Sequence, residues 1–246
     1  MAELNNPTRD PLCGVLIIDK PTGRSSMAAV THVRTRTGGR KGPKVGHAGT
    51  LDPLATGVLV VAVGKATRSI EAMMVTAKRY VTEIDLSAWT ASDDLESPLE
   101  PCDVPDPPSR AQIEAALTQF TGTFLQRPPA LSAIKVNGRR AYKAARAGEP
   151  IDLPLRTVTV HEVVITAYEW PVVTLDVHCA KGFYFRSLAR ELGGILKTGG
   201  HCRSIRRTAV GPFVIENATC LMDLPETIDQ ANLLSLDYAM ELLSGA

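Results

Sequence analysis

A loop of small residues carries a single acidic side chain. In KVGHAGTLDPLATGVLVVAVG, residues 44–64, Asp52 is the one carboxylate among Gly, Ala, Thr and Pro. A carboxylate can attack carbon as a nucleophile or carry a proton. Residues 58–63 form a short β-branched run, which predicts a strand buried on both faces that would hold the loop rigidly. Asp52 is therefore a candidate catalytic residue, and the alternative is an aspartate that only caps the turn before Pro53.

Two other stretches collect groups that suit a polyanionic substrate. Residues 127–148, RPPALSAIKVNGRRAYKAARAG, are rigid at two prolines and strongly basic after an Asn-Gly turn. The turn would lead from a strand into a helix that Gly148 ends. Residues 179–193, CAKGFYFRSLARELG, place Lys181, Tyr184 and Arg186 where a predicted strand meets a predicted helix. Like the Asp52 loop, both stretches depart from the ordinary pattern of core and surface residues.

Several motifs of other enzyme classes are absent. VGKAT resembles the end of a phosphate-binding loop, but the first glycine of that motif would fall on Leu59. The sequence has no G-x-S-x-G, H-E-x-x-H or G-x-G-x-x-G, and its five histidines lack metal-ligand spacing. Five scattered cysteines without C-x-x-C argue against a disulfide framework and a zinc site. We therefore expect neither metal nor cofactor, and free thiols.

The charge is segregated along the chain although the total is only +1. Residues 1–80 carry a net charge of +7 and residues 127–211 carry +8, whereas residues 81–126 carry −8 and residues 212–246 carry −6. Two basic blocks can form one positive face for a polyanion. On charge alone, solvated surfaces explain the blocks equally well.

The ends and the hydropathy of the chain indicate its setting. The first residues lack the basic and apolar regions of a secretory signal, and no apolar run approaches the roughly 20 residues that span a bilayer. We expect a cytoplasmic protein, a monomer, with no membrane partner and no nucleotide cofactor.

The elements that must position these residues alternate irregularly. We expect one helix with Ser25 or Ser26 as its N-cap and another opened by a capping box of Ser109 with Gln112. Further helices are expected at residues 66–77 and 183–196. Strands are expected at residues 15–18, 58–63, 79–86, 157–165 and 172–179. Neighbouring strands read as hairpins, which predicts an α+β fold with a mixed, mostly antiparallel sheet.

Six pieces of the sequence together resemble the TruB family of tRNA pseudouridine synthases. They are GVLIIDKPTGRSS, VGHAGTLDPLATGVLVV, KRYVTEIDL, QRPPALSAIKVNGRRAYKAARAG, KGFYFRSLARELG and IRRTAVGPF, in the family's order over residues 13–214. The resemblance implies the pseudouridine synthase catalytic fold and isomerisation of the T-loop uridine at position 55 of tRNA without metal or cofactor. It makes Asp52 the essential residue, presented to a uridine flipped out of its stack. Whether Asp52 attacks carbon or moves the C5 proton stays open.

The resemblance also assigns roles around the flipped uridine. His47 corresponds to the residue that inserts into the T-loop, and Tyr80 to the ring that stacks on the uracil. Tyr184 would line the base pocket, and Arg186 would pair with Asp52. The alternatives are a hydrogen-bonded loop histidine, an ordinary strand aromatic, and an arginine on a solvated helix face.

Further roles follow from the same matches and from the charge. Ile205 would contact the uracil through its backbone, or be simple core, and Lys20 would support the floor of the site, or be a turn lysine. Candidate phosphate contacts are Arg139, Arg140, Lys143, Arg146, Arg203, Arg206 and Arg207.

The sequence departs from the family pattern in places. Phe183 and Phe185 replace a threonine and an isoleucine, and the usual glycines beside Trp89 and after Asp94 are absent. After residue 214 we expect only a short acidic extension, residues 215–246, with a helix and without a full PUA domain; residues 1–12 would be a tail. Competing hypotheses are an RNA-binding or RNA-folding module on the same fold, a glycosidase or nuclease, and a pseudouridine synthase with another RNA target.

Overall fold

The computed structural model describes residues 12–131, 135–136, 139–140 and 153–245. Within these ranges the elements of the first half are β1 (Gly14–Lys20), α1 (Ser26–Arg36), β2 (Val45–Ala48), β3 (Thr56–Val63), α2 (Ile70–Met74), β4 (Lys78–Asp85), β5 (Ala88–Trp89), β6 (Glu100–Pro101), α3 (Arg110–Leu117), β7 (Gly122–Gln126), β8 (Lys135–Val136) and β9 (Arg139–Arg140). The second half adds β10 (Arg156–Glu169), β11 (Val172–Cys179), α5 (Phe185–Leu196), β12 (His201–Val210), β13 (Phe213–Val214), β14 (Thr219–Cys220) and α6 (Leu236–Ser244).

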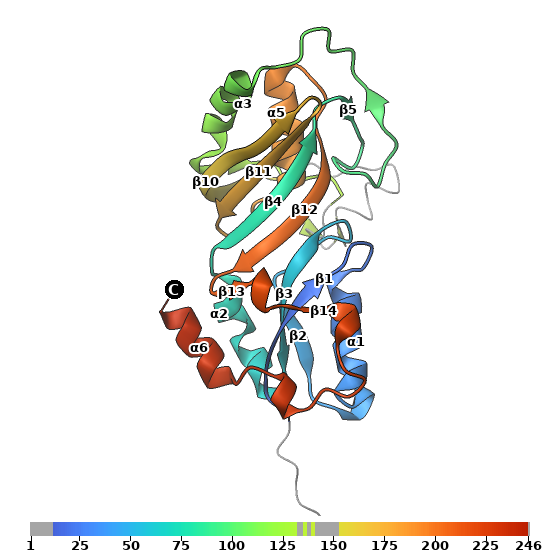
Figure 1. Cartoon of the computed structure of the whole chain (residues 1–246), viewed down its shortest axis with the longest axis vertical. Helices are drawn as coiled ribbons and strands as arrows, with labels where there is room; N and C mark the ends of the chain where they lie inside the picture. Colours follow the sequence, from blue (N-terminus) through green and yellow to red (C-terminus); the bar gives the residue numbers. More distant parts are fainter. Residues whose placement is uncertain (1–11, 132–134, 137–138, 141–152, 246) are drawn as a thin grey trace, which may run out of the picture.

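One mixed sheet runs through the whole elongated molecule (Figure 1). Its order is β14-β1-β3-β12-β4-β11-β10-β7, with β2 also paired to β3 and β13 to β12. All of these pairs are antiparallel except β1 with β14 and β3 with β12, which are parallel. The predicted α+β fold with a mostly antiparallel sheet is therefore confirmed.

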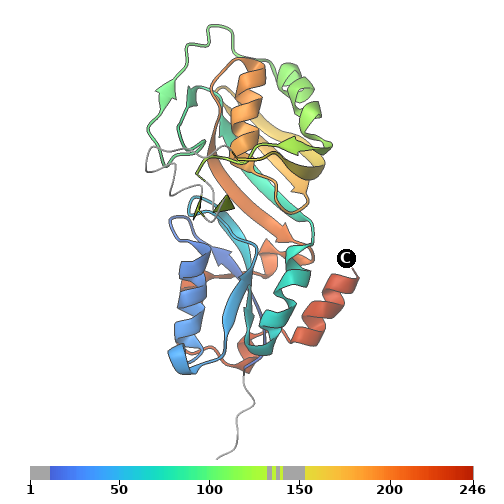
Figure 2. The ribbon, with the colours of Figure 1, turned by 180° about the vertical axis from the view of Figure 1, so that it is seen from behind.

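The sheet has an upper and a lower part in the view of Figure 1. In the upper part, β4, β10, β11 and β12 lie in front of α3 and α5, and Figure 2 shows the two helices from their own side. Alternate β11 residues such as Leu175 and Val177 are buried among the core side chains, whereas Thr174 and Asp176 are half-buried. This alternation of buried and half-buried residues fits a sheet covered by helices on one face.

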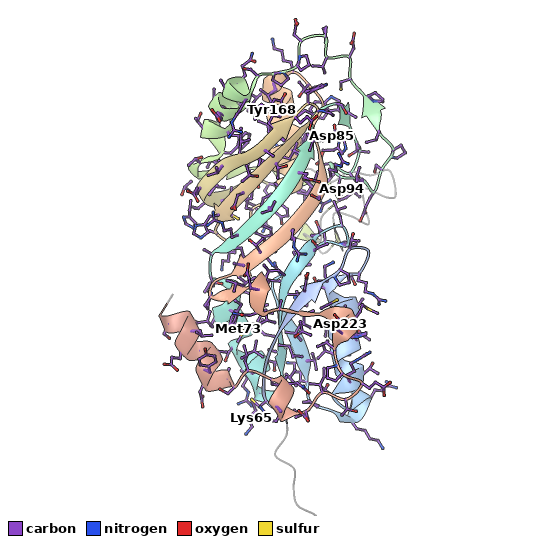
Figure 3. All side chains as sticks on the ribbon, viewed as in Figure 1. Lys65, Met73, Asp85, Asp94, Tyr168 and Asp223 are labelled. Carbon is purple, nitrogen blue, oxygen red and sulfur yellow. The ribbon has the colours of Figure 1, made fainter. Side chains whose placement is uncertain are left out.

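The lower part is built around β3. Leu59, Val61 and Val63 belong to one cluster of buried side chains, which includes side chains of α1. Val58 and Val60 belong to a second cluster with Met73 of α2 and side chains of α6 (Figure 3). Every residue of β3 after Thr56 is buried, so the prediction of a strand covered on both faces is confirmed.

Several predicted boundaries were tested by the structure. The capping box of Ser109 and Gln112 is present, and Ser25 rather than Ser26 caps α1. The helix predicted at residues 66–77 is wrong in length, since a 3-10 helix at Gly64–Ser69 precedes a short α2. A helix does form near the C-terminus, α6, and β14 also adds a strand beside β1. The helix predicted after the Asn-Gly turn lies outside the described residues.

Candidate active site

A cavity of about 460 Å³ lies where the two parts of the sheet meet. Its walls come from the loop before β3, from β4 and β12, and from the start of α5. Among its lining residues are Asp52, Tyr80, Tyr184, Arg186 and Ile205, five of the seven residues expected at the site. The structure thus brings together residues that are up to 153 positions apart in the chain.

The backbone of the Asp52 loop is tied to the start of α1. The Ser26 hydroxyl donates to the Leu51 carbonyl at 3.0 Å and accepts from the Leu51 amide at 2.8 Å. The Gly23 amide donates to the Pro53 carbonyl at 2.8 Å. Because the residues on either side of Asp52 are both held, the position of its Cα is fixed by α1 as well as by β3.

A buried arginine pairs with the exposed carboxylate. Arg186 Nη2 lies 2.7 Å from Asp52 Oδ2, and the side chain of Arg186 is only 7% exposed while that of Asp52 is 45% exposed. Arg186 Nη1 donates to the Leu131 carbonyl at 3.1 Å and lies 3.5 Å from Asp94 Oδ2. A guanidinium held on several sides can aim one carboxylate oxygen and leave the other free for chemistry.

Aromatic rings form one wall of the cavity. The Tyr80 and Phe185 ring centroids are 4.5 Å apart, and Phe183 contacts Phe185 edge-to-face at 5.0 Å. Burial raises the pKa of the Tyr80 hydroxyl, and the nearby charge of Arg207 partly opposes this shift. The phenol therefore stays neutral, and the wall offers ring faces and edges to a flat, unstacked base.

The backbone of Tyr184 is held by a buried amide. Its N–H donates to Gln126 Oε1 at 2.9 Å, and Gln126 Nε2 donates to its carbonyl at 3.1 Å. Gln126 is fully buried. Burial also raises the pKa of the Tyr184 hydroxyl. Tyr184 precedes α5, so the same clamp fixes the start of the helix that carries Arg186.

The other expected residues lie near the cavity in different ways. Ile205 is buried, lines the cavity and pairs with Thr82 of β4. Lys20 is fully buried and donates to the carbonyls of Pro21 and Arg24 at 2.8 and 2.7 Å. Burial lowers the pKa of Lys20 to about 8, although Asp52 opposes the shift. Lys20 thus supports the turn after β1.

His47 is half-buried on β2 and is not among the residues that line the cavity. Its Nδ1 is buried and has no partner among the described residues. Burial lowers the pKa of His47, and the charge of Arg207 lowers it further. The ring is therefore neutral at pH 7, which suits insertion between bases.

The seven candidate phosphate contacts are not equivalent. Arg203 is exposed on β12, whereas Arg206 is half-buried and makes a two-pronged pair with Asp19 at 2.8 and 3.2 Å. Arg207 is only 1% exposed, so a surface phosphate does not reach it, and the structure places it in the cavity wall. The other four are Arg139 and Arg140 in the backbone of β9, and Lys143 and Arg146 outside the described residues.

The described residues show no group of three or more His, Cys, Asp or Glu placed to hold a metal ion. In the same part of the chain, no helix combines the length and apolar character needed to cross a bilayer.

Comparison with known proteins gives a consistent result. The family model of the TruB family pseudouridylate synthase N-terminal domain matches residues 35–185, more than half of the chain. The chain belongs to the TruB family of pseudouridylate synthases. It is 46% identical over 219 residues to tRNA pseudouridine synthase B of Thermobifida fusca, covering 86% of this chain and 74% of that one. The corresponding protein of Phocaeicola vulgatus is 41% identical, with coverage of 88% and 93%.

Solved structures share the fold of this TruB family member. The crystal structure of a Cbf5-Nop10-Gar1 complex contains a chain that is 29% identical with a TM-score of 0.70. The match covers 93% of this chain and 62% of the Cbf5-complex chain, so this chain spans less than two thirds of its length. The candidate site therefore lies on the fold expected from the sequence, in a chain of the TruB family.

Sequence reasoning missed three residues of this TruB site. Asp94 follows β5 near the upper end of β12 (Figure 3), and its side chain is 3% exposed beside Arg186. Gln126 and Ser26 lie within the matching pieces, but the sequence assigns Gln126 no role and makes Ser26 only a candidate cap of α1. Gln126 directly precedes Arg127-Pro128-Pro129. A polar amide before a rigid turn was therefore the sequence feature that could have pointed to Gln126. For Asp94 there was none, because only the fold brings it to Arg186.

Proposed function

We propose that this enzyme isomerises the uridine at position 55 in the T-loop of tRNA, with Asp52 as the catalytic residue. Two facts support the tRNA substrate: relatives at 41–46% identity are named tRNA pseudouridine synthase B, and the match to one of them covers 96% of this chain. The observation that carries the role of Asp52 is its ion pair with the buried Arg186 at the edge of a cavity lined by aromatic rings.

The reaction needs the uridine to leave its stack. A flipped uridine would enter the cavity, with its ring against Tyr80 and its edge toward the β12 backbone at Ile205. His47 would occupy the space left in the T-loop. Since Tyr80, Phe183 and Phe185 present mainly carbon surface, their stacking would offset part of the cost of unstacking the base.

The chemical step exchanges one bond for another. The C1′–N1 bond breaks, the uracil turns within the cavity, a C1′–C5 bond forms, and the C5 proton is lost while N1 gains one. In one route Asp52 bonds to carbon and is later displaced, and in the other it takes part through proton transfer. Both routes use the ionised carboxylate that Arg186 aims, and both require the cavity to exclude water from C1′.

The RNA backbone would be bound by basic residues outside the cavity. The exposed Arg203 and the β9 pair Arg139 and Arg140 are the described candidates, with Lys143 and Arg146 beside them in sequence. Such contacts supply affinity that falls with salt, and the folded T-loop would be recognised by shape. The proposal places the enzyme in the cytoplasm, where its substrate is found, and lets it act as a monomer.

The test uses unmodified tRNA with the wild type and with Asp52→Asn. Pseudouridine is mapped by chemical adduct formation and primer extension. The proposal expects product at position 55 with the wild type and none with Asp52→Asn, although both bind tRNA with similar affinity. Product at another uridine would overturn the target, and equal product from Asp52→Asn would overturn the role of Asp52.

A further inference from the structure

Arg207 is a buried arginine whose donors face the catalytic loop. It lies on β12 and has the largest side chain of the fully buried set. Its Nε donates to the Val58 carbonyl at 2.7 Å, and its Nη2 donates to the Gly49 carbonyl at 3.1 Å. Its guanidinium also lies close enough to the Tyr80 hydroxyl to oppose, in part, the rise that burial causes in the pKa of that group. A buried guanidinium is costly to desolvate, so these acceptors keep the charge tolerable.

The two acceptors and the neighbouring Tyr80 all belong to the active site. Gly49 lies three residues before Asp52, and Val58 lies six residues after it, so one planar group holds both ends of the loop. Tyr80 is the ring proposed to stack on the uracil, and it comes from a different strand, β4. The guanidinium therefore sets the spacing between the carboxylate loop and the stacking ring.

The backbone around Arg207 is adapted to this approach. Arg207 pairs with Gly57 in the short parallel contact of β12 with β3. Gly57 has φ +98°, and a Cβ atom there would lie 2.1 Å from the Arg207 carbonyl oxygen. Only glycine permits the two strands to come this close, and without that approach the side chain would not reach Val58 and Gly49.

The charge of Arg207 has no carboxylate partner within ion-pair distance among the described residues. Lys20 and Lys78 both lie near enough for Arg207 to lower the pKa of their ammonium groups. An arginine kept only for stability would be expected to carry a buried acid, because an unpaired buried charge costs more than an apolar side chain. The arrangement indicates a geometric role.

We propose that Arg207 is a positioning residue: its fork holds the two ends of the Asp52 loop, beside the Tyr80 hydroxyl, in one fixed arrangement. The inference rests on the proposed catalytic role of Asp52. It replaces the phosphate contact expected from sequence, and the two roles differ in what they change. A lost phosphate contact weakens RNA binding and reduces its salt dependence. A lost positioning group slows the chemical step on bound RNA.

The test compares Arg207→Lys with the wild type. Lysine keeps the charge but reaches one acceptor, because it lacks the planar fork. We expect the single-turnover rate of pseudouridine formation at saturating tRNA to fall at least tenfold. The tRNA Kd and its salt slope should stay within twofold. The control is Arg110→Lys on α3, where an arginine bonded to the Ile165 carbonyl and to Glu114 lies away from the cavity. Its rate should match the wild type.

A coupling measurement separates positioning from general weakening of the fold. Tyr80→Phe removes the hydroxyl that lies beside Arg207 and keeps the ring. Tyr80→Phe slows the wild type by one factor and slows Arg207→Lys by another. If Arg207 and Tyr80 act together, the second factor is smaller than the first. All rates are measured well below each variant's Tm. The positioning role is overturned if the rate effects of the two substitutions simply multiply. It is also overturned if Arg207→Lys matches the wild-type rate at saturating tRNA and only binds RNA more weakly.

A second measurement needs no folded variant. In the wild-type protein, the Nε–H of Arg207 should give an NMR signal that exchanges slowly with water at pH 7.5, because Val58 accepts it in a buried site. Fast exchange of that proton would refute the buried hydrogen bond from Arg207 Nε to the Val58 carbonyl. If the wild type forms pseudouridine at no position of tRNA, the proposed function has failed, and the Arg207 rates are then measured on whichever RNA it does modify.

Discussion

Removal of the Ser26 hydroxyl tests how far the loop depends on the start of α1. Ser26 is 2% exposed, and its Oγ makes both a donated and an accepted bond with the backbone of Leu51, next to Asp52. Ser26→Ala removes both partners at once. The neighbouring Ser25→Ala is the matched control, because Ser25 caps α1 by accepting from the Ala28 amide and does not contact the loop.

The expected cost follows from the two backbone groups left in a buried position. Each unsatisfied buried polar group costs about 1–3 kcal/mol, so Ser26→Ala should lower the free energy of unfolding by roughly 2–6 kcal/mol. Loss of an N-cap costs about 1 kcal/mol, which is the expectation for Ser25→Ala. Since a misplacement of about 1 Å can cost a hundredfold in rate, Ser26→Ala should also slow catalysis tenfold or more.

The assay combines urea unfolding with the single-turnover rate at saturating tRNA, at a temperature where both variants are folded. Ser25→Ala should keep a rate within about twofold of the wild type, because only helix stability changes. A Ser26→Ala enzyme that matches the rate of Ser25→Ala would refute the reasoning, since Leu51 would then hold Asp52 without its buried hydrogen bonds.

Three other outcomes follow from the structure. Gly57→Ala should lower the free energy of unfolding by more than about 3 kcal/mol in urea, because φ is +98° and a backbone oxygen blocks the Cβ. Gly194→Ala, with nothing within 4 Å of the new Cβ, should instead gain about 0.5–1 kcal/mol. Burial lowers the pKa of Lys78 to about 8, so the unfolded state binds more protons than the folded state between pH 8 and about 10.4. The free energy of unfolding of the wild type, minus that of Lys78→Met, should therefore rise with pH across this window. A difference that stays flat or falls refutes the shift. Burial raises the pKa of Cys179 to about 12. Iodoacetamide at pH 8 should therefore label Cys102 and leave Cys179 unmodified until urea unfolds the chain. Mass spectrometry reads the labelled positions.

Local patterns were enough to predict the parts of the fold that depend on local physics. The run at residues 58–63 is a strand buried on both faces because its β-branched side chains fit both core clusters. The Ser109 capping box formed because its two hydrogen bonds lie within four residues. The helix predicted at residues 66–77 is shorter at both ends. Its first residues belong to the 3-10 helix Gly64–Ser69, and at its C-terminal end the carbonyls of Met74, at 2.6 Å, and Thr76 accept hydrogen bonds from Lys78 Nζ.

The site was predictable where a motif carried it and not where the fold assembled it. Asp52 and Arg186 were assigned from pieces 134 residues apart, and their 2.7 Å contact is in the structure. The participation of Asp94 was not predictable, because its place beside Arg186 depends on the backbone bridge of Asp94 with Cys202 of β12. Arg207 looked like a surface cation in the sequence, since nothing in IRRTAVGPF distinguishes it from Arg206; only the register of β12 puts one inside and one outside.

The cavity lies at the junction of the two parts of the sheet, and three arginines bridge that junction. β3 and β12 join the lower and upper parts through only two residue pairs, Arg206 with Thr56 and Arg207 with Gly57 (Figures 1 and 2). Asp52 belongs to the lower part, whereas Arg186 and Tyr80 belong to the upper part. Asp52 and its partners therefore keep their distances only if contacts connect the two parts of the sheet. The Arg186–Asp52 pair, the Arg206–Asp19 pair and the Arg207 fork all cross it, so each guanidinium links the two parts where backbone pairing is sparse.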